Sequence, residues 1–214
     1  MAKKYQNKDK TIHPLVWITM IGLAVILIVT IIMFQPSANE KFFNEYQKTA
    51  ETWDSYKLPE KNVIKRSSLK EVLAKIEAGE LVVVYFGNTT NAISANVIQD
   101  VHARLVGNNN PSLSDSPDRL GSDLYTEKLV EVIYHVTVKD ADHLKEIAAA
   151  INEKLDPKVE DMNDLVFPAL VAFDKLDGKD KPEVLKQVSF AANSQAKVVR
   201  DFYKDLLEKV KPAA

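Results

Sequence analysis

An uninterrupted apolar run from Leu15 to Phe34 limits most strongly what this chain can form. The run contains no charged residue, and at about 1.5 Å rise per residue a helix of this length matches a hydrocarbon core of roughly 30 Å. A secretory signal usually has a shorter apolar region of about 7–15 residues that ends at a small-x-small cleavage site. Here the segment Pro36-Ser37-Ala38 places a proline where a small residue is needed, and no cysteine follows for a lipid anchor. We therefore expect an uncleaved transmembrane helix over residues 15–34.

The charges that flank this run predict its orientation. Four lysines and a single acid lie in residues 1–14, whereas Glu40 and Lys41 balance each other after the run. Lysine and arginine are enriched on the cytoplasmic side of membrane spans. We therefore expect a single-pass protein of the cell membrane with a cytoplasmic basic tail, contact with lipid through its helix, and an extracytoplasmic C-terminal domain.

Composition excludes several kinds of function for the rest of the chain. Residues 35–214 are enough for one domain with its own core. The formal net charge of the chain is −2, and its basic and acidic residues are interspersed, so we expect no nucleic-acid partner. The chain has no cysteine, which excludes disulfides, thiolate metal sites and thiol chemistry. The acidic stretches 153–164 and 174–180 lack the spacing of a calcium loop, and we expect no metal and no cofactor.

Aromatic residues at helical spacing predict a membrane-proximal helix over residues 40–56, followed by a linker to residue 66. Such a helix has three possible contacts for its aromatic stripe: its own domain, the bilayer surface or a partner helix. The stripe consists of Phe42, Phe43, Tyr46 and Trp53.

From residue 67 onward, helical and strand patterns alternate. Ser67 or Ser68 predicts a helix N-cap, with Glu71 three residues after Ser68 as a capping box. Gly79 predicts the end of that helix, and Asp140 predicts a second N-cap. Parallel βαβ units followed by an antiparallel hairpin indicate a mixed sheet with helices on both faces. The predicted elements are a helix from residue 69, a strand 81–86, a helix 91–106, a polar loop 107–123, a strand 129–138, a helix 141–155, a strand 166–173, a turn at Asp177-Gly178, a strand 183–190, and a helix from Asn193 or Ser194 to about Lys211.

The order of these elements resembles the thioredoxin fold. The strand Val82–Phe86, followed by Gly87-Asn88-Thr89-Thr90 and a helix that begins at Asn91, is similar to the strand and Cys-x-x-Cys helix of that family. The segment Val166–Phe173, with Phe167-Pro168, resembles the family's cis-proline strand. The resemblance covers residues 67–211 and implies an α/β domain whose Phe167–Pro168 peptide bond is cis.

The sequence departs from that family at the residues that carry its chemistry. Asn91 and Ser94 stand where thioredoxins have two cysteines. The thiolate is the nucleophile of thiol–disulfide exchange, so we expect no redox activity and no catalytic residue. A hydroxyl nucleophile at Ser94 or Thr89 requires a general base, and none of the four histidines lies beside these residues in the sequence. The sequence predicts Asn91 as an N-cap, and a hydroxyl-based enzyme remains an alternative.

What the resemblance leaves is a binding groove. Thioredoxin-like proteins pair the backbone beside the cis-proline with an extended segment of a client, which is a form of strand addition. The resemblance therefore implies a non-redox binding module that captures an extended polypeptide, or assembles with another protein of the bacterial envelope, in a chaperone or accessory role. The implied groove is formed by Thr89, Thr90, Asn91, Ser94, Phe167 and Pro168.

Three alternatives stay open at this point. Pro168 can simply shape its strand while Phe167 fills the core. The chain can be a structural subunit of a membrane complex that acts through its span and the 40–56 helix. It can also be an accessory protein for peptide or bacteriocin export.

Overall fold

The structure is a computed structural model that describes residues 13–51, 58–59, 61–107, 123–156, 162–175, 179–191 and 196–211. It divides into two compact units, residues 1–38 and residues 39–214. Trp53, the Asp177-Gly178 turn and the predicted loop residues 108–122 lie outside the described residues.

The first unit contains one long apolar helix, α1 (Pro14–Phe34), with no buried residue. Pro14 occupies the first helical position, where the missing N–H costs no hydrogen bond. The hydroxyls of Thr19 and Thr30 donate to the carbonyls four residues earlier, at 2.6 and 2.7 Å, so both polar groups are satisfied within the helix. The helix coincides with the predicted segment 15–34 and is long and apolar enough to cross a membrane.

The second unit is built on a five-stranded mixed sheet with the strand order β1-β3-β2-β4-β5. Strand β3 pairs parallel with β1 and β2, whereas β4 pairs antiparallel with β2 and β5. The predicted α/β class with a mixed sheet is therefore confirmed. The strands are β1 (Ile64–Arg66), β2 (Val82–Gly87), β3 (Ile133–Thr137), β4 (Ala169–Asp174) and β5 (Glu183–Ser189).

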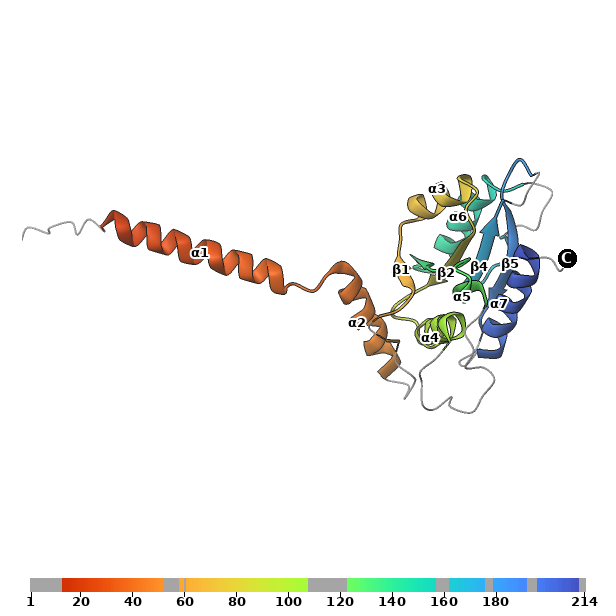
Figure 1. The fold of residues 1–214 in the computed structure, drawn as a ribbon, viewed down its shortest axis with the longest axis horizontal. Helices are drawn as coiled ribbons and strands as arrows, with labels where there is room; N and C mark the ends of the chain where they lie inside the picture. The colour runs from red at the N-terminus through yellow and green to blue at the C-terminus, as the bar shows by residue number, and fades with distance from the viewer. Residues whose placement is uncertain are drawn as a thin grey trace, which may run out of the picture. The chain divides into compact units, whose positions relative to one another are not determined.

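Helices cover both faces of this sheet (Figure 1). One face packs against α3 (Leu69–Glu77) and α6 (Ala141–Asn152). The other packs against α4 (Ala92–Val106), α7 (Ala196–Val210), the short α5 (Asp123–Thr126) and α2 (Ala38–Glu51).

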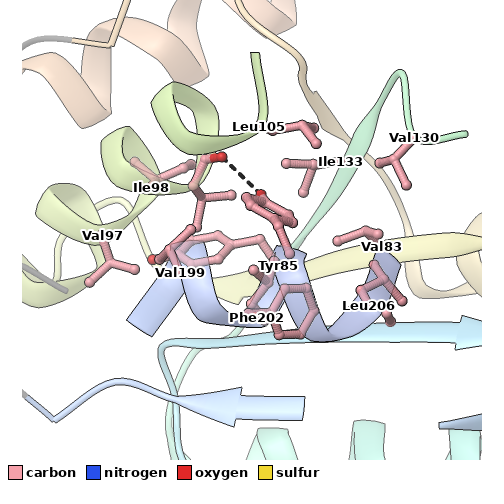
Figure 2. Packing of buried hydrophobic residues seen from close by; sticks show 14 of the residues in the cluster. Val83, Tyr85, Val97, Ile98, Leu105, Val130, Ile133, Val199, Phe202 and Leu206 are labelled. Atoms are coloured by element: carbon pink, nitrogen blue, oxygen red, sulfur yellow. Dashed lines mark hydrogen bonds between the residues drawn. The ribbon is translucent and has the colours of Figure 1, made fainter. Parts of the chain in front are cut away.

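Strand β2 explains why the sheet needs both layers. Successive side chains of a strand point to opposite faces, and all six residues of β2 are buried. Val83 and Tyr85 join the cluster with α4 and α7, whereas Val84 and Phe86 join the cluster with α3 and α6. Figure 2 shows the first cluster, in which side chains of α4 and α7 converge on Tyr85. The continuous apolar run therefore predicts a central strand covered on both sides, as observed.

The N-caps predicted at Ser68, Asn91 and Asp140 are confirmed, whereas Asn193 and Ser194 lie outside the described residues. The side chains of Ser68, Asn91 and Asp140 accept hydrogen bonds from backbone N–H groups three residues later, at 3.2, 2.9 and 2.8 Å. Gly79 has φ +74° directly after α3, a conformation that glycine adopts without strain.

The short helix α5 was not predicted, α6 ends at Asn152 instead of residue 155, and three strands differ from the prediction. Strand β1 lies within the predicted linker. It was not predicted because its three residues include one apolar side chain and give no periodic pattern. Strand β3 begins at Ile133 instead of residue 129, since the amides of Leu129 and Val130 bond to the carbonyl of Leu124 and not to a neighbouring strand. Strand β4 begins at Ala169 instead of residue 166, and the segment before it forms the site described next.

Candidate functional site

The segment before β4 lies at the end of β2. The pairing of β2 with β4 ends at Phe86 and Ala169, so Phe167 and Pro168 directly precede the paired part of β4. The chain leaves the sheet after Gly87, turns, and begins α4 at Ala92. The Phe167–Pro168 peptide bond is cis, as predicted.

The six residues of the predicted groove divide into two sets. Thr90 is exposed, and Asn91 and Phe167 are half-buried, so these three have surface available to a partner. Thr89, Ser94 and Pro168 are buried, and the Ser94 side chain has no exposed surface at all.

Val166 and Phe167 precede β4 and are here called the Val166–Phe167 edge. The Phe167 side chain packs in part against the cluster that contains α3 and α6. Val166 is 62% exposed, and every other exposed large apolar side chain among the described residues belongs to α1. The backbone N–H of Val166 donates to the hydroxyl of Ser189 at 2.9 Å, and the carbonyl of Pro168 accepts from Phe190 at 2.9 Å. The backbone of Phe167, between them, makes no hydrogen bond to a described residue. Backbone groups without a partner in the fold can pair with an added extended chain.

Ser94 is the centre of a buried hydrogen-bond network. Its hydroxyl accepts from the backbone N–H of Asn88 at 2.9 Å and lies 3.2 Å from the hydroxyl of Tyr85 and 3.3 Å from that of Tyr46. The Tyr85 hydroxyl also donates to the Ser94 carbonyl at 2.8 Å. These bonds hold the loop between β2 and α4 from its buried side. Because the hydroxyl is enclosed and committed to these partners, Ser94 is not presented to a substrate.

His135, on β3, joins this network through Tyr46. The Tyr46 hydroxyl lies 2.6 Å from Nε2 of His135, and the rings of Phe42, Tyr46 and Tyr85 surround the imidazole. His135 is fully buried, and its Nδ1 has no hydrogen-bond partner among the described residues. Burial lowers the pKa of His135 to about 3 and raises the pKa values of Tyr46 and Tyr85, so all three are neutral near pH 7.

Helix α2 packs on its own domain through this cluster. Phe42 and Tyr46 are buried, and the hydroxyl of Thr49 donates to the carbonyl of Thr89 at 2.6 Å. Phe43 is half-buried, and Trp53 lies outside the described residues. Of the three contacts open to the aromatic stripe, the described part of the helix therefore uses the first. This packing also explains why Thr89 and Ser94 are covered.

Sequence reasoning missed the connection between Ser94 and a histidine. His135 is 89 residues from Tyr46 in the chain and gives no local motif, and only the pairing of β3 with β2 brings it beside Tyr85. Among the described residues, no group of three or more histidines or acidic residues is placed to hold a metal ion.

Comparison with models of protein families and with curated proteins finds no match to this chain. The function therefore has to be argued from the site itself.

Proposed function

We propose that this protein is a membrane-tethered, non-redox binding module of thioredoxin-like fold. The strand order β1-β3-β2-β4-β5, with β4 antiparallel to its neighbours, supports this assignment. Asn91 caps the helix that follows β2, and Phe167-Pro168 precedes β4, in the positions that the resemblance requires. Without cysteine this site has no thiolate, so binding replaces exchange.

The binding element is the Val166–Phe167 edge, and the observation that carries the proposal is its unused bonding capacity. An exposed β-branched side chain stands beside a backbone that bonds to no described residue. Strand addition requires this combination, because main-chain hydrogen bonds supply affinity and a neighbouring apolar side chain supplies contact area. Thr90 and Asn91 border the same end of β2 and have accessible surface. The ligand class is an extended polypeptide.

A substitution of Val166 tests this proposal. Val166→Asp is expected to weaken binding of a permanently unfolded probe, reduced and carboxymethylated α-lactalbumin, by tenfold or more, because it places a charge in an apolar contact. Val166→Ile, which keeps a β-branched apolar side chain, is the matched control and should bind as the parent does. Binding is measured by fluorescence anisotropy with the full chain in nanodiscs.

Global stability is expected to change by less than about 0.5 kcal/mol in both variants, since the side chain is largely exposed. Equal probe binding by Val166→Asp and Val166→Ile would remove the edge as the binding element.

The other part of the proposed function is membrane tethering by α1. Helix α1 holds the domain at the membrane, where tethering raises the local concentration of the binding edge toward other envelope proteins. We expect the protein to remain in the membrane pellet after extraction with alkaline carbonate, which releases peripheral proteins. Replacing Leu23 and Ile26 by lysine should release it, because each charge at the centre of a span costs about 2.5–3.5 kcal/mol. Release of the unchanged protein by carbonate would contradict the anchor.

The alternative of a structural subunit that acts through the aromatic helix has less support. Phe42 and Tyr46 face the interior of their own domain, so the described part of α2 offers a partner mainly its polar side. An accessory role in peptide export uses the same edge, since an exported peptide is itself an extended polypeptide.

A further inference from the structure

Helix α2 is held on the domain by a contact that has a titratable group at its centre. Of the side chains that α2 buries, Phe42 lies 4.6 Å from the His135 ring between centroids, and Tyr46 bonds to Nε2 of His135 at 2.6 Å. Further along α2, the hydroxyl of Thr49 donates to the carbonyl of Thr89, which lies in the loop before α4. His135 is thus the point on the sheet at which the helix docks.

The surroundings of His135 disfavour a positive charge. From α2 it faces Phe42 and Tyr46, from β2 it faces Tyr85, and its partner in the register of β1 is Arg66. None of these groups is acidic, and the guanidinium of Arg66, which also lies 5.9 Å from the Phe42 ring, opposes protonation. The charge of Asp100, on α4, raises the pKa of the Tyr85 hydroxyl. Within the described part of the chain, an imidazolium at this position has no carboxylate partner, and Nδ1 has no acceptor.

We propose that α2 is an acid-released latch: protonation of His135 undocks the helix from β3 and α4. Undocking hydrates the imidazole and uncovers the Ser94 hydroxyl and the Thr89 carbonyl. The latch does not depend on the Val166–Phe167 edge, and it is tested by the position of α2 and not by the binding of a polypeptide.

Linkage gives the sign and the size of the effect. In the docked state burial holds the pKa of His135 at about 3, whereas a hydrated histidine has a pKa of about 6.5. The contribution of neutral His135 to docking is therefore complete above about pH 6.5 and is lost as the pH falls toward 3. Well inside this window each pH unit weakens the docking equilibrium about tenfold, and between pH 7.5 and pH 4.5 the total is about 90-fold.

The test is a distance measured across the latch. The chain has no cysteine, so spin labels can be placed at Lys48→Cys on the outer side of α2 and Lys204→Cys on α7, both exposed positions. Pulsed electron–electron resonance on the full chain in nanodiscs should give one narrow distance at pH 7.5. A longer, broader component should grow as the pH falls to 4.5. A second label pair, Lys70→Cys with Lys204→Cys, reports on the domain alone and should stay narrow.

Substitution of histidine isolates the switch. His135→Gln keeps an amide that can bond to Tyr46 but does not titrate, and it should abolish the acid-dependent component. His102→Gln is the matched control, because His102 is also buried, with its pKa lowered to about 4 by burial, yet it lies on α4 and accepts a hydrogen bond from the backbone N–H of Val63. It should open as the parent does.

Three results would overturn the latch. The parent can stay docked at pH 4.5, His135→Gln can open with the same pH dependence as the parent, or the Lys70–Lys204 distance can broaden in parallel with the Lys48–Lys204 distance. If His135→Gln does not fold, the other two results, both measured with an unchanged His135, keep their force.

Discussion

Tyr46→Ala is expected to detach helix α2 from the domain at neutral pH. The Tyr46 side chain is 1% exposed, bonds to His135 and Ser94, and packs against Phe42 with ring centroids 5.0 Å apart. Truncating a buried aromatic side chain to alanine costs about 3–5 kcal/mol, and here the loss falls on the contact that docks the helix. No disulfide holds α2 on the domain. We therefore expect the helix to undock while the rest of the domain stays folded.

Hydrogen exchange measured by mass spectrometry on the full chain checks this. The amides of α2 should lose at least a hundredfold of their protection in Tyr46→Ala, whereas those of β2 and β4 keep most of theirs. Lys48→Ala is the control, since that side chain is exposed on the same helix and its loss should leave the protection of α2 unchanged. Unaltered protection of α2 in Tyr46→Ala would mean that the helix is held by other contacts.

Gly87→Ala is expected to destabilise the domain by about 2–3 kcal/mol. A methyl group at this position would lie 2.5 Å from the Ser94 hydroxyl oxygen, 2.5 Å from Cε1 of Tyr85 and 3.0 Å from the Tyr46 hydroxyl. These atoms belong to buried side chains that bond to one another, so they cannot move apart without breaking the network. Overpacking of this kind typically costs about 1–3 kcal/mol, and here a disturbed hydrogen bond adds to it.

Urea denaturation followed by circular dichroism measures the change. Gly22→Ala is a matched control, because a methyl group there meets no atom within 4 Å and the residue lies in α1. It should leave the unfolding midpoint of the domain unchanged. A Gly87→Ala protein as stable as its parent would show that the interior around Ser94 is looser than these distances indicate.

What the sequence predicted correctly was mostly local. Ser68, Asn91 and Asp140 each cap a helix through a backbone N–H three residues away, so the information lies within a few positions. The continuous apolar run of β2 likewise predicted its burial on both faces. The cis bond at Phe167–Pro168 came from the family resemblance, since no local pattern requires it.

What the sequence could not predict depends on distant contacts. The aromatic stripe of residues 40–56 indicated an apolar helix face without saying which surface covers it, and its partner, His135, lies on another strand. Strand β1 was missed because a three-residue edge strand is defined by its pairing with β3. The burial of Ser94 follows from the docking of α2, so a groove drawn from the resemblance alone included residues that the fold covers.

The most direct test of the account is hydrogen exchange at one amide, that of Phe167, observed by nuclear magnetic resonance with the full chain in nanodiscs. In the free protein this amide bonds to no described residue and should exchange rapidly. Saturation with carboxymethylated α-lactalbumin should slow its exchange at least tenfold, because strand addition supplies an acceptor. The amide of Phe190, already bonded to the carbonyl of Pro168, serves as the internal reference and should not change. If the probe binds and the Phe167 amide exchanges as fast as before, the polypeptide is held elsewhere and the Val166–Phe167 edge is not the binding element.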